Sequence, residues 1–408
     1  MTYNDAYEKL EQHGQTHLLR YYDELAPDAQ AKLLQQIAVT SFDVLSSIEN
    51  RAIIDQKGVI SPLKAMEIPE IDIRRDEFTA IGSAAIRAGK VGAVLLAGGM
   101  GTRLGSDHPK GMYDIGLTRS VYIFQRLFEN MLDVAAQTAT FFPLYIMTSD
   151  KNHDETTAFL AKHDYFGYDE GKITFFKQEM APASDYQGRV YLEDKGTIST
   201  SPNGNGGFYA SMHKWGVAEA AKAQGVEWLN IFAVDNVLQR ICDPAFIGAT
   251  IDSGCVAGAK VVKKNARDER VGAMCLEDGR PSIVEYYDMT DELMDAVDEK
   301  GDPAYNFGVI LNYLFRVSAL DAHMAKKLPL HVVEKKIAYL GDDGSVVHPD
   351  APNGYKYECL VLDMIHDLDS CLPYEVDRTH EFAPIKNLTG IDSVESARRM
   401  CREAGIVL

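Results

Sequence analysis

The chain has 408 residues, of which 46% are hydrophobic and 25% charged, an ordinary globular composition with enough length for more than one structural unit. Its formal net charge of −19 disfavours extended binding to nucleic acid or to anionic membranes, so an anionic substrate would need a few local cations. The six cysteines are scattered without a Cys-x-x-Cys pair, which is typical of reduced thiols rather than of a zinc site or a disulfide framework. The first residues are acidic and polar, and no apolar run approaches membrane-spanning length, so we expect a cytoplasmic protein without a membrane partner.

The predicted elements begin with helices and continue as alternating strands and helices. Apolar residues recur at helical spacing near the start of the chain, which predicts a helical N-terminal cap over residues 1–85. Short apolar runs then alternate with helical patterns, which predicts an α/β core over residues 86–342. Its strands are expected at residues 91–97, 143–148, 173–178, 228–234, 255–263, 271–276, 282–286 and 308–315, and its helices at 120–132, 155–163, 206–224 and 319–327. A short C-terminal segment, 343–408, completes the prediction.

A glycine-rich stretch directly follows the first predicted strand of the core. It reads Leu96-Ala-Gly-Gly-Met-Gly-Thr-Arg-Leu-Gly105 and is followed closely by Pro109-Lys-Gly-Met-Tyr-Asp114. Glycines let a backbone turn sharply and approach a ligand closely, and exposed N–H groups in such a loop suit phosphate oxygens. Arg103 and Lys110 add two cations. Because the stretch matches neither the Walker A loop nor the dinucleotide fingerprint, we predict a loop of another kind that holds a nucleoside triphosphate.

Two further motifs are consistent with a nucleotide site. Asp235 directly follows the predicted strand 228–234, and open α/β sheets place ligands at such strand ends, where one carboxylate can hold Mg²⁺ between phosphates. A turn-starting aspartate is the alternative. Pro202-Asn-Gly-Asn-Gly-Gly207 is a second glycine-rich turn, which either contacts a ligand or is only the start of the helix that follows. Phosphoryl transfer needs alignment and charge neutralisation more than a covalent nucleophile, so these residue types are sufficient for it.

Together these motifs resemble the signature of the UDP-N-acetylhexosamine pyrophosphorylases of eukaryotic type, a family of sugar-1-phosphate uridylyltransferases. The general nucleotidyltransferase signature contains only the glycine-rich half, so Lys110-Gly-Met-Tyr-Asp114 is the more specific part. The likeness spans about Val91 to Asn387, with several motifs in the right order. It implies an α/β, Rossmann-like nucleotidyltransferase fold of the GT-A-like kind, with a mixed and mainly parallel sheet.

The resemblance also implies a role for each site residue. Arg103 would clamp the leaving pyrophosphate, Lys110 would contact the α- and β-phosphates, and Lys386 would return a further cation to the phosphate bridge. Asp235 would bind both substrate and Mg²⁺. The remaining substrate contacts would be Ala97, Gly98 and Gly99 with the nucleotide, Gln178 with the uracil edge, Gly204 with the base or ribose, Asn205 with a sugar hydroxyl, Gly272 through its backbone, and Glu285 and Asn306 with sugar hydroxyls.

The activity that this resemblance implies is Mg²⁺-dependent attack of a sugar-1-phosphate on the α-phosphate of UTP, which gives a UDP-sugar and pyrophosphate. N-acetylglucosamine-1-phosphate, or its galactosamine epimer, is the expected sugar. Glucose- or galactose-1-phosphate is the alternative, because Leu360-Val-Leu-Asp363 stands where the family has Phe-Val-Phe-Asp, and Val309 stands where it has asparagine.

Two functions of other classes are weighed against this one. A catalytically silent UDP-sugar sensor would have no need of the leaving-group cations. A metal-dependent glycosyltransferase would want an Asp-x-Asp motif, which Asp235-Asn-Val237 does not supply. Family members continue into a further C-terminal domain where this sequence ends, and we expect a monomer.

Overall fold

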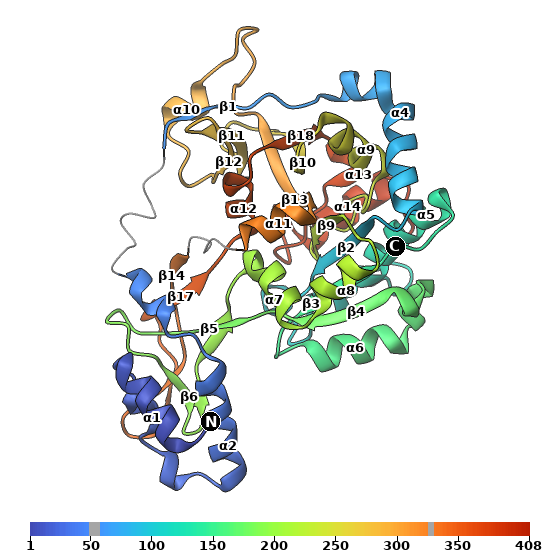
Figure 1. Cartoon of the computed structure of the whole chain (residues 1–408). Helices are drawn as coiled ribbons and strands as arrows, with labels where there is room; N and C mark the ends of the chain where they lie inside the picture. Colours follow the sequence, from blue (N-terminus) through green and yellow to red (C-terminus); the bar gives the residue numbers. More distant parts are fainter. Residues whose placement is uncertain (49–57, 325–329) are drawn as a thin grey trace. The chain divides into compact units, whose positions relative to one another are not determined.

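The computed structural model describes residues 1–48, 58–324 and 330–408 of the chain, which divides into two compact units. Unit 1 consists of Met1–Lys57, Glu179–Gly207 and Leu328–Val361, and unit 2 consists of Gly58–Gln178, Phe208–Lys327 and Leu362–Leu408. Once it has begun unit 2, the chain therefore leaves it twice to complete unit 1. The colours of Figure 1 follow the chain through both units.

Unit 2 is built on a mixed sheet whose strands, in the described part of the chain, number ten (Figure 1). The main path runs β1-β11-β13-β9-β2-β3-β4, while β10 pairs with β13 and β18, and β12 pairs with β11. β9, β2, β3 and β4 are parallel, and β13 joins β9 in antiparallel. This arrangement confirms the predicted α/β fold class. The strands are β1 (Ile60–Pro62), β2 (Val91–Leu96), β3 (Leu144–Thr148), β4 (Ile173–Lys177), β9 (Trp228–Ala233), β10 (Ala257–Lys263), β11 (Ala273–Glu277), β12 (Arg280–Val284), β13 (Phe307–Arg316) and β18 (Cys371–Glu375).

The helices of unit 2 bury apolar faces in the same core. In α5 (Ile123–Thr138), Phe124, Leu127 and Met131 recur at helical spacing and are fully buried. The predicted helix 206–224 is interrupted, because Gly216 adopts a left-handed conformation between α7 and α8. The end of the predicted helix 319–327 lies outside the described residues. The remaining helices are α4 (Ile68–Arg87), α6 (His153–Lys162), α7 (Phe208–Lys214), α8 (Val217–Ala223), α9 (Pro244–Ser253), α10 (Asp291–Asp295), α11 (Val317–His323), α12 (Val361–Asp367), α13 (Arg378–Glu381) and α14 (Val394–Glu403).

Two glycines let α4 pack directly on α9. A Cβ at Gly82 would lie 1.9 Å from the carbonyl oxygen of Pro244, and one at Gly248 would lie 1.8 Å from that of Phe78. Only glycine permits so close an approach of two backbones. α4 is therefore part of unit 2, which differs from the predicted cap over residues 1–85. Within that range, residues 49–57 lie outside the described residues.

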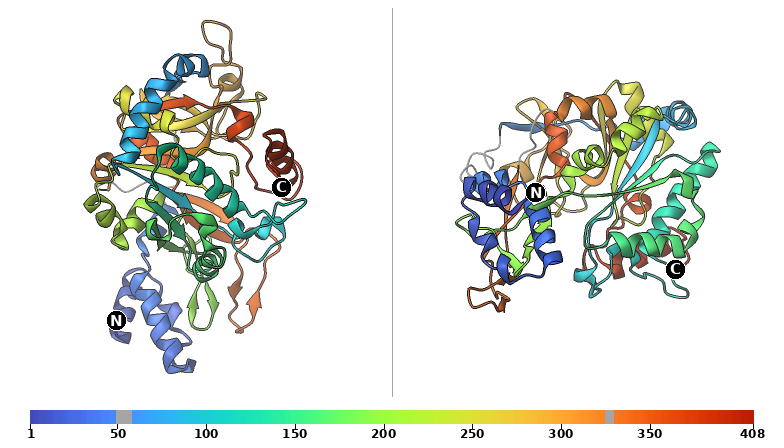
Figure 2. Two further views of the ribbon diagram at one scale, coloured as in Figure 1. Left: turned by 90° about the vertical axis from the view of Figure 1, so that its right-hand side faces the viewer. Right: turned by 60° about the horizontal axis from the view of Figure 1, so that its bottom comes forward.

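The end of the chain is also divided between the units, unlike the predicted single segment 343–408. Residues up to Val361 complete unit 1, and the rest return to unit 2. There the Arg398 Nε donates to the Ile115 carbonyl (3.0 Å), and the Thr118 N–H donates to the Leu408 carbonyl (3.0 Å). The C-terminal helix α14 therefore packs on the loop before α5 (Figure 2).

In its described residues, unit 1 combines two α-helices with short strand pairs. Its core includes Leu10 and Leu33 from the helices and Leu192 and Ile198 from the strands. The elements are α1 (Tyr3–Gln12) and α2 (Pro27–Val39), with the strand pairs β5 (Met180–Pro182) and β8 (Thr200–Pro202), β6 (Leu192–Asp194) and β7 (Thr197–Ile198), β14 (His331–Lys335) and β17 (Gly354–Glu358), and β15 (Tyr339–Leu340) and β16 (Val346–Val347). Within the described ranges of both units, no helix is long and apolar enough to cross a bilayer.

Candidate functional site

Four neighbouring parallel strands of unit 2 end at one edge of the sheet, here called the carboxyl edge. Leu96 pairs with Ala233 on one side and with Met147 on the other, and Thr148 pairs with Lys177. The loops that follow β9, β2, β3 and β4 therefore leave the sheet together. Ligands of open α/β sheets bind at such an edge.

The glycine-rich loop after β2 folds back on itself. The Gly101 N–H donates to the His108 carbonyl (2.8 Å), and Gly105 adopts the left-handed conformation, with φ of +70°. The Lys110 N–H then donates to the Gly99 carbonyl (3.2 Å). This hairpin returns Lys110 to the first glycines of the loop, so both predicted halves of the motif lie in one place.

Two amide side chains fix the start of this loop. Asn152, which is buried, donates from Nδ2 to the Ala97 carbonyl (2.8 Å) and to the Gly99 carbonyl (3.4 Å). Gln178 packs flat against Gly98, where an added Cβ would lie 2.5 Å from its Nε2. The structure thus brings Gln178, the residue predicted to read the uracil edge, against the loop, and it adds Asn152, which sequence reasoning missed. An asparagine at the start of a helix is ordinary, so its position alone gave no signal.

Lys110 and Asp235 approach each other at the carboxyl edge. The Lys110 Nζ lies 3.7 Å from the Asp235 Oδ2, and the side chains are 14% and 24% exposed. Burial lowers the pKa of Lys110, and the charges of Arg103 and Lys386 lower it further, whereas Asp235 opposes the shift. Asp235 therefore lies beside Lys110, and Arg103 and Lys386 are near enough for their charges to act on that lysine.

Arg103 and Lys386 differ in how they are held. Arg103 is exposed, and its guanidinium makes no hydrogen bond or ion pair within residues 1–48, 58–324 and 330–408. The Lys386 Nζ lies 3.0 Å from the Asp392 Oδ2. Its backbone is fixed beside β9, because the Ile385 N–H donates to the Asp235 carbonyl (2.9 Å). This contact brings a distant part of the chain to the carboxyl edge.

Two of the four predicted sugar contacts lie together on the antiparallel side of the sheet. Gly272 and Glu285 flank the paired residues of β11 and β12, and a Cβ at Gly272 would lie 3.5 Å from the Glu285 Oε1. The Gly272 carbonyl accepts the N–H of Val309, the residue that replaces the family's asparagine (2.9 Å). The main-chain carbonyl of Asn306 instead accepts the Lys264 N–H (2.9 Å), and Asn306 lines a pocket of about 200 Å³.

The second glycine-rich turn belongs to unit 1, whereas the other candidate residues belong to unit 2. At Gly204, with φ of +87°, a Cβ would lie 2.2 Å from the Cys359 carbonyl oxygen. The Asn205 Oδ1 accepts the Val361 N–H (2.9 Å). These contacts explain the glycine and the asparagine as parts of a tight backbone packing against residues 359–361 of the same unit.

Comparison with known proteins extends these observations to the whole chain. Residues 34–405 match the model of the family described as UTP–glucose-1-phosphate uridylyltransferase. A mouse protein named UDP-N-acetylhexosamine pyrophosphorylase-like protein 1 is 36% identical over 94% of this chain and 80% of its own length. The UDP-N-acetylglucosamine pyrophosphorylase of Saccharomyces cerevisiae is 34% identical over 96% of this chain and 85% of its own.

A solved structure agrees with the fold. The uridine diphosphate N-acetylglucosamine pyrophosphorylase of Trypanosoma brucei, crystallised with an inhibitor, has a TM-score of 0.82 and 24% identity to this chain. The match covers 97% of this chain and 84% of that one.

Proposed function

Because the chain belongs to the UTP–glucose-1-phosphate uridylyltransferase family and is a UDP-sugar pyrophosphorylase, we propose that its sugar substrate is N-acetylglucosamine-1-phosphate. The yeast relative, which is named for this sugar, supports the proposal. Glucose-1-phosphate is the second candidate, because Val309, whose N–H donates to the Gly272 carbonyl, stands where the family has an asparagine.

The group of Arg103, Lys110, Asp235 and Lys386 at the carboxyl edge is the observation that carries the proposed mechanism. An oxygen of the sugar phosphate attacks the α-phosphorus of UTP, and the bond from that phosphorus to the bridging oxygen of pyrophosphate breaks. The attacking oxygen is already anionic, so no general base is required. Arg103 takes the leaving pyrophosphate, Lys110 the α- and β-phosphates, and Lys386 the phosphate bridge. Cations placed at this edge stabilise the negative charge that develops on the phosphates.

Asp235 is the proposed Mg²⁺ ligand. In the described part of the chain, no three His, Cys, Asp or Glu side chains cluster to hold a metal by themselves. Mg²⁺ commonly binds through one or two carboxylates together with substrate phosphates, so a single carboxylate beside a phosphate-binding loop fits it. When bound, the ion would neutralise phosphate charge and help to align the reacting groups.

The remaining residues are proposed to recognise the nucleotide and the sugar. Main-chain groups of Ala97, Gly98 and Gly99 face the triphosphate, and Gln178 reads the uracil edge through its amide, which both donates and accepts hydrogen bonds. The other proposed contacts are Gly204 and Asn205 with the nucleoside and sugar, and Gly272, Glu285 and Asn306 with the sugar. A cytoplasmic, monomeric protein without nucleic-acid partners stays a prediction.

The activity is tested by pyrophosphate release from UTP with a panel of sugar-1-phosphates. We expect the highest kcat/KM with N-acetylglucosamine-1-phosphate. Turnover only with unacetylated hexoses would replace the first sugar by the second candidate. A silent sensor would bind UDP-sugar in a calorimeter but would exchange no labelled pyrophosphate into UTP.

The proposed metal role is tested with Asp235→Asn. This change keeps the shape of the side chain but removes its charge, so both activity and the apparent Mg²⁺ affinity should fall together. The measurement is a Mg²⁺ titration of the initial rate at saturating substrates. An unchanged midpoint would exclude Asp235 as a ligand.

A further inference from the structure

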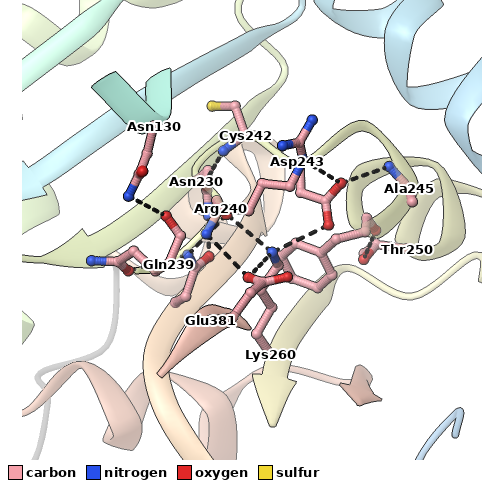
Figure 3. Close-up of polar contacts among 12 residues, drawn as sticks. Asn130, Asn230, Gln239, Arg240, Cys242, Asp243, Ala245, Thr250, Lys260 and Glu381 are labelled. Carbon is pink, nitrogen blue, oxygen red and sulfur yellow. Dashed lines mark hydrogen bonds and ion pairs between the residues drawn. The ribbon is translucent and has the colours of Figure 1, made fainter. Parts of the chain in front are cut away.

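A buried ion cluster lies next to the loop that carries Asp235 (Figure 3). The Lys260 side chain, on β10, is fully buried, and its Nζ lies 2.5 Å from the Glu381 Oε2 and 3.2 Å from the Asp243 Oδ2. Lys260 also donates to the Arg240 carbonyl (3.0 Å). A buried ammonium is costly unless it is paired and hydrogen-bonded, so each of these partners matters to the fold.

The two carboxylates of the cluster serve different segments. Asp243 begins α9, where its Oδ1 accepts the Ala245 N–H (3.1 Å). Glu381 ends α13, and its Oε2 also accepts the Arg240 N–H (3.1 Å). The chain runs directly from Glu381 to Lys386, the proposed phosphate-binding cation. Glu381 therefore begins the segment that carries Lys386, and Asp243 does not.

This segment lies along the loop after β9. The Asn236 Nδ2 donates to the Glu381 carbonyl (2.7 Å), and the Asn236 Oδ1 accepts the Ala383 N–H (2.9 Å). The last contact is that of Ile385 with the Asp235 carbonyl. Glu381 is therefore held twice at the start of the segment, by its carboxylate in the cluster and by its carbonyl on Asn236.

The loop that carries Asp235 has a further anchor of its own. The buried Gln239 donates from Nε2 to the Ala233 carbonyl (2.8 Å) and to the Asn236 carbonyl (2.9 Å). The Asn130 Nδ2 on α5 donates to the Gln239 carbonyl (3.0 Å), as Figure 3 shows. Loss of the Glu381 carboxylate would leave these bonds intact, so the loop keeps its own anchors although it loses the bond from the Arg240 N–H. The segment from Glu381 to Lys386 loses its anchor in the ion cluster, so we expect the larger displacement there.

We propose that Glu381 is a positioning residue for uridylyl transfer: its buried carboxylate fixes the segment that presents Lys386 to the phosphates, opposite Asp235. The inference rests on the proposed function, which assigns Lys386 to the phosphate bridge. Transfer depends on alignment, and a displacement of about 1 Å can cost about a hundredfold in rate. A cation that acts mainly in the transition state is expected to change kcat more than KM.

The test compares four variants by kcat and KM, each normalised to the folded fraction. Glu381→Gln preserves the size of the side chain and one acceptor oxygen. We expect it to lower kcat about tenfold or more, with little change in KM for UTP or for the sugar phosphate. Asp243→Asn is the matched control, because it removes a carboxylate from the same ammonium but leaves the Glu381 segment in place. Both should lower the melting temperature, whereas only Glu381→Gln should lower kcat.

A double-mutant cycle with Lys386→Ala identifies the route of the effect. If Glu381 acts through Lys386, Glu381→Gln should slow Lys386→Ala by much less than it slows the wild-type chain. Equal losses in both backgrounds, or equal losses of kcat in Glu381→Gln and Asp243→Asn, would overturn the positioning role alone. Normal turnover of Lys386→Ala would overturn the role assigned to Lys386, and the positioning role with it.

Discussion

At the scale of residues, the charges around Lys110 predict how the rate depends on pH. Burial and the neighbouring Arg103 and Lys386 hold the pKa of Lys110 below its ordinary value. A neutral lysine cannot offset phosphate charge, so kcat/KM should fall as the pH rises through this lowered pKa. Arg103→Ala removes one of the charges that lower the pKa of Lys110. The fall of kcat/KM on the alkaline side of the pH profile, here called the alkaline limb, should therefore move to higher pH.

Arg103→Ala should also lower the maximal rate about a hundredfold, because the leaving pyrophosphate loses a cation that stabilises its charge. Asp235→Asn should move the limb the other way, since Asp235 stabilises the charged lysine. The measurement is kcat/KM across neutral and alkaline pH for the wild type and both variants. An alkaline limb at the same pH in all three would show that Lys110 does not set it.

The residues that could be predicted are those whose chemistry is visible in a short motif. Arg103, Lys110 and Asp235 follow strands or glycines directly along the chain, and the structure groups them. Lys260 and Glu381 could not be predicted, because a charged residue is ordinarily expected at the surface. Their burial follows from pairings between distant segments, which the local sequence does not contain.

At the scale of elements, the glycine-rich loop should depend on Asn152. Asn152→Ala leaves the buried carbonyl of Ala97 without its donor, which should cost about 2 kcal/mol of stability. The loop should also bind UTP more weakly, because its first turn loses an anchor. Calorimetric titration with UTP and thermal melting measure the two effects.

A control for Asn152→Ala lies on the same helix, α6. The Thr156 Oγ1 is buried, and within the described residues it has no hydrogen-bond partner. Thr156→Val should therefore leave both UTP affinity and stability close to the wild type, or raise the stability slightly. If both variants weaken UTP binding equally, the cause is a general loosening of α6 and not the loss of the hydrogen bond from Asn152 to the Ala97 carbonyl.

The proposed contacts with the nucleotide and with the sugar lie on different elements. Substitution of one glycine at each place tests this assignment. A methyl at Gly272 would lie 2.7 Å from the Ile283 Cγ2, beside the Glu285 carboxylate. Gly272→Ala should raise KM for the sugar phosphate about tenfold and leave KM for UTP unchanged. Gly99→Ala adds the same methyl in open space at the loop after β2, and it should raise KM for UTP instead. The reverse pattern would contradict both assignments.

Most of the core elements could be predicted, whereas the unit boundaries could not. The apolar runs that became β2, β3 and β9 are buried and continuous, and such runs carry a strong local signal. The strands of unit 1 are only two to five residues long, so their local signal is weak, and the unit is assembled from three segments far apart in the sequence. The place of α4 depends on Gly82 and Gly248, and a glycine inside a helix weakens the local pattern rather than showing what it contacts.

At the scale of the whole molecule, the cysteines report on the unfolding of unit 2. Cys242, Cys275, Cys371 and Cys401 are buried in unit 2, whereas Cys255 and Cys359 are half-buried. Burial raises the pKa of the Cys401 thiol to about 11. A protonated, inaccessible thiol reacts with maleimide only after the surrounding structure opens. Labelling of the four buried thiols should therefore follow the unfolding of unit 2.

Substrate binding should slow this labelling, because a ligand that binds only the folded state stabilises it by mass action. With Mg²⁺, UTP at about one hundred times its Kd adds about 2.7 kcal/mol, which corresponds to about hundredfold slower labelling when opening and closing are fast. Mass spectrometry after a maleimide pulse measures each thiol separately, and Cys255 serves as the internal control. Cys359 lies against the Gly204 turn of unit 1, so protection confined to it would place the nucleotide on that turn without coupling to the carboxyl edge. Protection of all four buried thiols would instead show that UTP binding stabilises unit 2, as the proposed site requires.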